Sequence, residues 1–461
     1  MAATSVPHAL WSSRLSFLFA AVGSAVGLGN IWKFPYMTGA NGGGAFVLVY
    51  LAASVLIATP VLMSEVLVGR HAQLSPPGSM QFVAEESGAS RHWRVFGYLG
   101  LAGAFLIMSF YSVIAGWSLA YVPKAASGAL TGLDAASIQG VFGELLSSPT
   151  EMALWQALFI AVTGFIVIRG VNRGIERALH LLMPTLFVML VAFMVYSAMA
   201  GDLSAAARFL LTPDFSKLTP SAVMAAIGQA LFSLSVGFGA MMTYGAYVPR
   251  DVDITRSSVI IAVVDTLVAL AAGFAIFPIV FANGIDPSEG PGLIFISLSL
   301  SFAQMPAGAL LGTLFFLLLI FAALTTSIGF IEPIVAWAEE NRGIPRARSV
   351  VLSCVSVWVV GLATVFSFNI WSELHLLGNF QTFAGKTPFD LIDYLITNIM
   401  QPAGALLLVI FVGWKIKDSL RRHELGAADG KSNGLYGAWL IAVKYVAPIV
   451  IVTLFVMGIT A

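Results

Sequence analysis

Eight residues decide the fold of this chain: GSAVGLGN, residues 23–30, in the middle of its first long apolar stretch. Three of the eight are glycines, and each glycine in a helix interior costs about 1 kcal/mol relative to alanine. Irregular backbone at membrane depth is tolerated only where it lines a cavity enclosed by protein or filled with water. The stretch therefore predicts a broken membrane helix beside a small polar cavity.

A second stretch of the same kind, SLSVGFG, lies in the other half of the chain at residues 233–239. Small residues can serve close helix packing in membranes. Packing alone, however, does not explain why the polar residues Asn30 and Asp265 lie within apolar runs of the chain. A carboxylate inside a membrane is expensive and marks a functional site by default. The two stretches together favour a site for a cation and a small substrate.

The composition places both stretches in a membrane protein. The chain has 461 residues, of which 58% are hydrophobic and 10% charged, where soluble domains carry about 25% charged residues. Zero formal net charge argues against a nucleic-acid partner. The single cysteine, Cys354, excludes an internal disulfide framework and a cysteine-rich metal site.

Long apolar runs without alternation predict helices rather than a β-barrel, and about 20 apolar residues cross a bilayer. We therefore expect an all-α integral membrane protein with eleven transmembrane helices, at residues 14–37, 43–68, 95–122, 152–168, 179–200, 221–248, 257–281, 306–337, 349–368, 389–414 and 438–458. The short run at 293–302 is expected to form an extramembrane or re-entrant helix.

Lysine and arginine residues orient the spans. Most of them fall on one side when the N-terminus is placed inside, which predicts a cytoplasmic N-terminus. The two breaks then lie in helices 1 and 6, the first of each half of a 5+5 inverted repeat, an architecture of secondary transporters. The expected parts are an N-terminal segment (1–13), the two repeats (14–200 and 221–414), a cytoplasmic loop (415–437), and the eleventh helix with an external C-terminus (438–461).

At these residues the chain resembles the neurotransmitter:sodium symporter family, in particular its bacterial branch, which transports leucine and other hydrophobic amino acids. The resemblance runs from Trp11 to about Trp414 and is carried by four motifs: GLGNIWKFPY (27–36), NGGGAF (41–46), GQALFSLS (228–235) and AALTTS (322–327). Family members commonly have a twelfth span, for which we see no counterpart here. The resemblance implies sodium-coupled symport into the cell by alternating access, at the bacterial inner membrane.

The resemblance also implies two sodium sites built from oxygen ligands, which suit a hard cation. The first would use the Ala25 carbonyl and the side chains of Asn30, Ser233 and Asp265, completed by the substrate's carboxylate. The second would use the carbonyls of Gly23, Val26 and Ala322 and the hydroxyls of Thr325 and Thr326. For the two threonines, a bond to the preceding turn of their own helix is the alternative interpretation.

For the substrate, the resemblance implies that the amides of Leu28 and Gly29 and the Tyr111 hydroxyl hold a carboxylate. Carbonyls near Ala25, Phe232 and Ser235 would meet the amino group. The side chain would face Ile107, Phe232, Phe238, Thr326 and Phe330. Each of these aromatic residues could instead be ordinary core.

Two positions, Gly27 and Ala269, restrict which substrate and which ions we expect. Gly27 stands where the monoamine carriers of this family have an aspartate, and no charge replaces it, so a zwitterionic amino acid is expected. The apolar walls would leave a charged side chain unpaired, which favours a neutral, apolar amino acid. Ala269 stands where chloride-dependent relatives have a serine, one turn after Asp265, so transport without chloride is expected.

Two pairs of residues match the gates of the family. Lys33 and Asp393 match the outer pair, in which an arginine is usual, and a lysine should make a looser latch. His8 and Glu340 match the inner pair, again with histidine in place of arginine. Because histidine titrates near pH 6.5, the hypothesis is an inner gate that weakens as the pH rises. The alternative is an exposed histidine without a role in gating.

Three other classes of function are weaker alternatives. A proton-coupled carrier could share the same core, and a channel could share the apolar helices. An intramembrane enzyme is disfavoured because the chain has neither a His-Glu-x-x-His nor a Gly-x-Ser-x-Gly motif. The sequence leaves open the preferred amino acid and the choice between monomer and homodimer.

Overall fold

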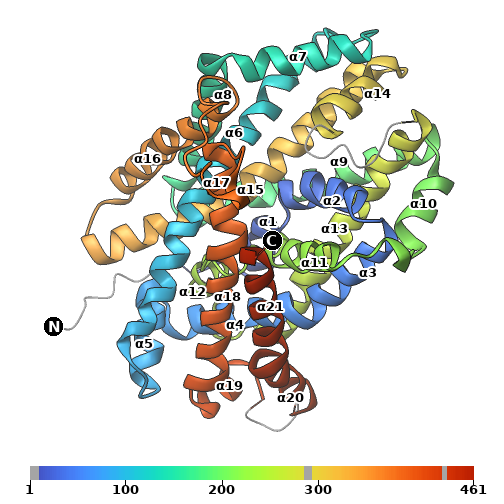
Figure 1. Ribbon diagram of the computed structural model, residues 1–461. Helices are drawn as coiled ribbons and strands as arrows, with labels where there is room; N and C mark the ends of the chain where they lie inside the picture. The colour runs from blue at the N-terminus through green and yellow to red at the C-terminus, as the bar shows by residue number, and fades with distance from the viewer. Residues whose placement is uncertain (1–9, 285–292, 428–432, 461) are drawn as a thin grey trace.

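The computed structural model describes residues 10–284, 293–427 and 433–460. These residues form helices joined by loops, with no β-strand among them (Figure 1). The helices of the first half are α1 (Arg14–Ala25), α2 (Phe34–Ala40), α3 (Gly44–Ala53), α4 (Thr59–Ala72), α5 (Pro76–Glu86), α6 (Val95–Ala126), α7 (Ala135–Ser147), α8 (Pro149–Val167), α9 (Arg177–Ala200) and α10 (Leu203–Leu211). Those of the second half are α11 (Pro220–Ser233), α12 (Ala240–Ala246), α13 (Ile254–Ala282), α14 (Ser299–Gln304), α15 (Gly308–Arg342), α16 (Arg346–Ser367), α17 (Pro388–Tyr394), α18 (Gln401–Ile410), α19 (Asp418–Glu424), α20 (Asn433–Ile441) and α21 (Ala447–Thr460).

Several α-helices continue one another through short π-helical segments. Such segments lie at Gly29–Lys33, Ser54–Ala58, Val171–Glu176, Leu293–Leu298, Leu395–Met400, Phe411–Lys415 and Ala442–Val446. Single turns of 3₁₀-helix lie at Arg91–Arg94, Phe215–Lys217 and Gln381–Phe383.

In the described part of the chain, nine continuous helices are long and apolar enough to cross a membrane. They are Gly44–Ala72, Arg91–Ala126, Pro149–Val167, Val171–Ala200, Ile254–Ala282, Gly308–Arg342, Arg346–Ser367, Pro388–Lys415 and Gly434–Gly458. Arg14–Ala25 and Gly29–Ala40 pass the same test only as a pair, bent by 47°. The sixth predicted span consists of two shorter helices, α11 and α12, on either side of the second glycine stretch.

The first break begins where α1 ends. The Ser13 side chain caps the start of α1 by accepting the amide of Ser16, and the helix continues to Ala25. Val26 then adopts extended dihedral angles, φ −74° and ψ 97°, so the helical hydrogen bonds stop there. The break thus falls within the glycine-rich stretch, as the sequence predicts.

The second break depends on backbone conformations that L-residues rarely adopt. Ser235, Gly237 and Gly239 have φ values of 52°, 93° and 75°. Glycine takes such angles at no steric cost, whereas a residue with a Cβ atom is strained in them. Consequently α11 ends at Ser233, and helical structure resumes only at α12.

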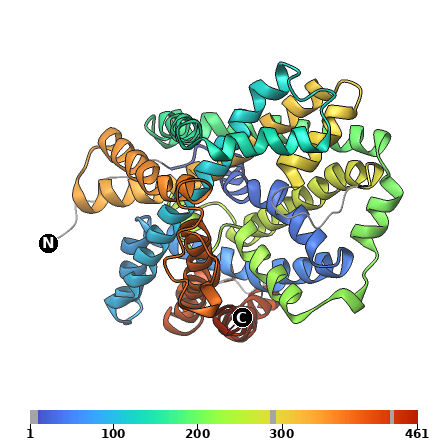
Figure 2. The same ribbon diagram turned by 45° about the horizontal axis from the view of Figure 1, so that its top comes forward.

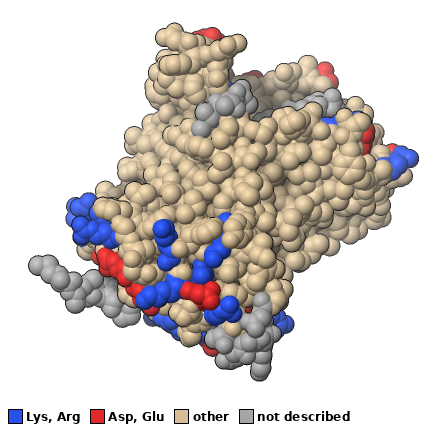
Figure 3. All heavy atoms as spheres, turned by 60° about the horizontal axis from the view of Figure 1, so that its bottom comes forward, with Lys and Arg blue, Asp and Glu red and all other residues tan. Residues whose placement is uncertain are grey.

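Both breaks lie inside the molecule, where longer helices surround them. The helix α1 packs against α9, α13 and α15, and two views show these segments near the centre of the helical array (Figures 1 and 2). Charged side chains gather instead at the end that carries α5, α19 and α20, while the walls are largely uncharged (Figure 3). This distribution is that of a multi-pass membrane protein with one arginine-rich end.

Candidate functional site at the helix breaks

The two breaks face each other and are joined by side-chain bonds to backbone. The Ser235 hydroxyl donates to the Ser24 carbonyl at 2.8 Å, and the Gln229 amide donates to the Gly29 carbonyl at 2.8 Å. The Ser24 carbonyl is thus held by the opposite segment, and the Gly29 carbonyl accepts from the opposite segment as well as from the Phe34 amide of its own. This pairing keeps polar backbone satisfied in an apolar interior.

The side chains of the first predicted sodium site converge in the structure. Asn30 donates to Asp265 Oδ1 at 2.8 Å and to the Ser233 hydroxyl at 3.0 Å, and Ser233 donates to Asp265 Oδ2 at 2.6 Å. All three side chains are at most 1% exposed. Ala25, whose carbonyl is the fourth predicted ligand, is the last residue of α1. The group offers several oxygen atoms and one carboxylate, which is the donor set that a monovalent hard cation requires.

The second predicted sodium site also brings its residues together. The Thr325 hydroxyl lies 3.4 Å from the Val26 carbonyl and 2.9 Å from the Ala322 carbonyl. The hydroxyl of Thr326 lies 3.4 Å from the Gly23 carbonyl. The Thr325–Ala322 contact is the back-bond to its own helix that we named as the alternative, and the contacts across to α1 exist beside it.

The residues predicted to hold a substrate carboxylate pair with each other. The Leu28 amide, in the first break, donates to the Tyr111 hydroxyl at 3.1 Å. Tyr111 is buried on α6, and its ring packs edge-on against Phe330 with the centroids 6.3 Å apart. An arriving carboxylate could accept from the same groups, since an unwound segment presents free backbone amides to an anion.

Position 27 has no room for a side chain. A Cβ atom on Gly27 would lie 2.3 Å from Thr326 Oγ1 and 2.8 Å from the Tyr111 hydroxyl. Both distances are far below van der Waals contact, so an aspartate at this position would have to displace both residues. The close approach gives a steric reason for the glycine, beside the chemical argument from the missing charge.

Apolar side chains enclose the space beside the break. Ile107, Phe238 and Phe330 are buried, and Phe232 is partly exposed. Phe238 packs over Gly103 of α6, where an added Cβ would lie 2.6 Å from the ring. No charged side chain belongs to this predicted lining set, so it suits an apolar group.

Glu65 of α4 holds the second break open. Its carboxylate accepts the amides of Gly237 at 2.7 Å, Gly239 at 3.4 Å and Met242 at 3.2 Å. These amides stand at the unwound segment and the start of α12, where no intrahelical acceptor is available. The buried negative charge is thus balanced by backbone dipoles.

On the side predicted to face outward, Lys33 and Asp393 line one cavity of about 410 Å³. Within the described residues they form no ion pair with each other. Instead the Lys33 ammonium lies 4.3 Å above the Phe232 ring, in cation–π geometry. Phe232 also belongs to the cavity lining, and a Cβ atom added to Gly29 would lie 3.1 Å from its ring, so this side chain adjoins both the cavity and the first break.

On the side predicted to face the cytoplasm, Trp11 packs against α12. Its indole donates to the Tyr244 carbonyl at 3.0 Å, and its amide donates to the Tyr247 carbonyl at 2.8 Å. Glu340 accepts the Ser75 amide at 2.6 Å. His8, its predicted gate partner, lies outside the described residues.

Sequence reasoning missed a second inner contact. Glu332 is fully buried, receives the Arg346 guanidinium at 3.1 Å, and accepts from the Tyr247 hydroxyl at 2.9 Å. It also missed Tyr50, whose hydroxyl lies 3.3 Å from Ser233, and Gln229. A glutamate inside the apolar α15 was the one available signal, and it did not identify the partners.

The chain is similar in sequence to sodium-dependent transporters, and in structure to a solved protein. The family model described as "Sodium:neurotransmitter symporter family" matches residues 8–135 and 142–461. The chain is 37% identical to YhdH, a sodium-dependent transporter of Bacillus subtilis, over 96% of both chains. It is 34% identical to a sodium-dependent transporter of Haemophilus influenzae over 97% of both chains. Among solved structures, MhsT in complex with L-phenylalanine matches with a TM-score of 0.89 and 38% identity, covering 98% of this chain and 100% of that one.

Proposed function

Because this chain belongs to the sodium:neurotransmitter symporter family, we propose that it couples sodium entry to uptake of a neutral, apolar amino acid, without chloride. The observation that carries this proposal is the buried group of Asn30, Ser233 and Asp265 between the two helix breaks. Its single carboxylate suits one monovalent cation, and the Leu28 and Gly29 amides of the first break would suit a substrate carboxylate.

Coupling would follow from shared ligands. A substrate carboxylate held by the Leu28 and Gly29 amides and the Tyr111 hydroxyl would lie next to Asp265 and Asn30. A sodium ion between them would bind both the protein and the substrate. Each ligand then raises the affinity of the other by the same factor, which is thermodynamic reciprocity.

The neutral substrate class rests on the enclosing side chains. Ile107, Phe238 and Phe330 offer no partner to a charged group, and burial of an unpaired charge is costly. The similar structure of MhsT is a complex with L-phenylalanine, an apolar amino acid, which supports the same class. The carboxylate of Asp265, present at the first sodium site, is a fixed negative charge that makes a bound chloride unnecessary.

A second sodium site would be formed by the carbonyls of Gly23, Val26 and Ala322 and by the Thr325 and Thr326 hydroxyls. Each sodium that enters down a tenfold gradient releases about 1.4 kcal/mol, and a 100 mV potential adds about 2.3 kcal/mol per charge. Two ions then supply about 7 kcal/mol, enough to concentrate a zwitterion about 10⁵-fold.

Alternating access would require two closures. Lys33, Phe232 and Asp393 line the outer cavity, and a bound substrate below Phe232 would draw this side together. On the inner side, the buried Glu332 with Arg346 and Tyr247 would keep the path closed until the cycle turns. Opening that side requires these bonds to separate.

The proposal is tested by uptake into proteoliposomes, with each of the twenty amino acids and an imposed sodium gradient. We expect uptake of apolar amino acids that stops when choline replaces sodium and continues when gluconate replaces chloride. Uptake that persists in choline under a proton gradient would show a proton-coupled carrier instead. Uptake of charged amino acids only would refute the assigned substrate class.

A further inference from the structure

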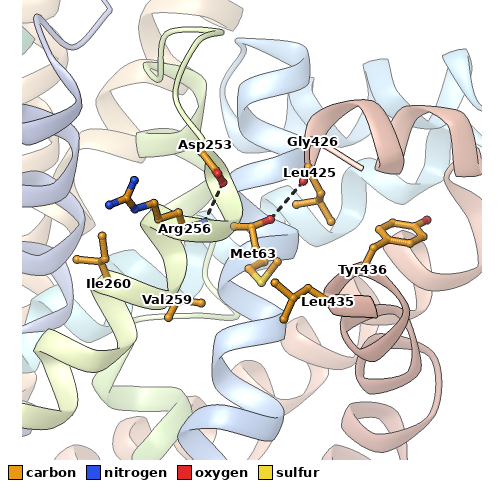
Figure 4. A pocket seen from close by; sticks show the side chains of 10 residues that line it. Met63, Asp253, Arg256, Val259, Ile260, Leu425, Gly426, Leu435 and Tyr436 are labelled. Atoms are coloured by element: carbon orange, nitrogen blue, oxygen red, sulfur yellow. Dashed lines mark hydrogen bonds between the residues drawn. The ribbon is translucent and has the colours of Figure 1, made fainter. Parts of the chain in front are cut away.

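A second cavity, of about 390 Å³, opens at the arginine-rich end between α4, α13 and α20 (Figure 4). It lies apart from the site at the helix breaks, and none of the residues assigned above to sodium, substrate or gates lines it. The lining residues that matter below are Met63, Arg256, Val259, Leu425, Leu435 and Tyr436.

The wall of this cavity is apolar and open toward the bilayer. Val259 is 46% exposed and Leu435 is 68% exposed, although both are aliphatic. The exposed stripe continues along α13 through Val263 and Leu267, which follow Val259 at intervals of four residues and so lie on one helix face. At 1.5 Å per residue the stripe extends about 12 Å beyond Val259. An acyl chain is the apolar partner that a membrane offers along such a stripe.

A free cation stands at the mouth of the cavity. Arg256 lies one turn before Val259, and its guanidinium makes no hydrogen bond or ion pair within the described residues. Among the residues that the structure describes, Asp253 accepts only the backbone amide of Arg256, at 2.9 Å, as the cap of α13. Figure 4 shows Arg256 and Tyr436 on opposite sides of the cavity, above the apolar wall of Val259 and Leu435.

The roof of the cavity is held in place by buried bonds. Leu425 follows Glu424, whose carboxylate is 1% exposed and pairs with Arg70 at 2.7 Å and with His71 at 3.0 Å. The Thr255 hydroxyl adds a bond to the Leu425 carbonyl at 3.4 Å. The cavity is therefore framed by a fixed contact between α4, α13 and α19.

We propose that this cavity binds one anionic phospholipid from the adjoining leaflet, with its phosphate on Arg256 and an acyl chain along Val259, Val263 and Leu267. A guanidinium binds phosphate oxygens in a bidentate manner. Basic pockets between membrane helices are known to bind anionic head groups. A zwitterionic lipid carries its own ammonium group beside the phosphate, so it gains less from a single unpaired arginine.

Native mass spectrometry of the detergent-purified full chain tests this proposal, with phosphatidylglycerol and phosphatidylcholine of identical acyl chains. We expect one tightly retained phosphatidylglycerol per chain and weaker retention of phosphatidylcholine. Arg256→Gln should weaken phosphatidylglycerol binding about tenfold, the factor that corresponds to 1.4 kcal/mol. Arg348→Gln is the matched control, because Arg348 is an exposed arginine that does not line the cavity.

A further variant separates the acyl chain from the head group. Leu435→Glu places a charge on the apolar wall and should weaken both lipids. Glycerol phosphate, which lacks acyl chains, should not compete with phosphatidylglycerol. Equal losses in Arg256→Gln and Arg348→Gln, no loss in either, or full competition by glycerol phosphate would each overturn the proposal.

Discussion

Replacing Asp265 by asparagine is the sharpest test of the first sodium site. The substitution keeps the size and planar shape of the side chain. An asparagine can still accept from Asn30 and can donate to the Ser233 hydroxyl, so the two short contacts of 2.8 and 2.6 Å keep partners. The principal loss is the negative charge.

The magnitude of that loss follows from the geometry. A sodium ion among Asn30, Ser233 and Asp265 lies within about 4 Å of the carboxylate, where one pair of unit charges at an effective dielectric constant of 20 interacts by about 4 kcal/mol. This energy corresponds to about a 10³-fold weaker sodium affinity. With sodium at 100 times the wild-type Kd, the ion stabilises the wild type by about 2.7 kcal/mol, and the variant by less than about 0.1 kcal/mol.

The assay is thermal unfolding of the purified protein in sodium chloride and in choline chloride. We expect a large sodium-dependent rise of Tm in the wild type and a smaller one in Asp265→Asn, in which only the second site keeps its ligands. Asp251→Asn, which removes an exposed carboxylate elsewhere in the chain, should behave as the wild type. A sodium titration of Asp265→Asn that coincides with that of the wild type would refute the assignment.

Three more predictions follow from contacts described above. Gly27→Ala places a Cβ atom 2.3 Å from Thr326 Oγ1, and overpacking of about 1–3 kcal/mol should weaken amino-acid binding between about 5- and 150-fold; unchanged binding would show that the site yields more than the structure implies. Arg346→Gln leaves the Glu332 carboxylate buried without its cation, at a cost of about 3–5 kcal/mol. The inner side should then open more often, so cysteine labelling from that side should increase. Equal labelling of the variant and the wild type would count against an inner closure. Burial raises the pKa of Glu424, but hydrogen bonds from His71 and Arg70 outweigh it and lower that pKa to about 2. Because the folded pKa lies below the ordinary value of 4.5, its stabilisation is complete above about pH 4.5 and is lost as the pH falls toward 2. Spin labels on α4 and α19 should keep their distance at pH 5 and separate near pH 2. Separation already at pH 5 would contradict this pKa.

The sequence predicted the features that have a local cause. Glycines and hydroxyl side chains in an apolar run indicate a helix break regardless of the surrounding tertiary structure. Both breaks lie where the sequence predicts them. The family resemblance named Asn30, Ser233 and Asp265 as a set, and the structure brings them together. What the sequence could not supply are contacts made by tertiary approach. Tyr50 reaches Ser233 and Gln229 reaches Gly29 across nearly two hundred residues, and no pattern within either segment encodes the partner.

Span counting shows a different limit. The sixth predicted span, in which the sequence predicts a break, consists of α11 and α12, neither of which is long enough to cross a bilayer. Its apolar character is set by composition, but the break depends on the positive φ values at Ser235, Gly237 and Gly239. The outer pair shows a similar difference, because Lys33 lies over Phe232 rather than beside Asp393.

Glu65 has a consequence for how the molecule can move. If the segment of residues 234–239 rewound into an ordinary helix, its amides would return to their own carbonyls and abandon a carboxylate in a hydrocarbon-like interior. Such a stranded anion would cost several kcal/mol or would have to take up a proton, so rewinding is disfavoured and the gap between α11 and α12 should persist during transport. The conformational change must then come from rigid groups of helices that tilt about this unwound segment, which Glu65 holds in place.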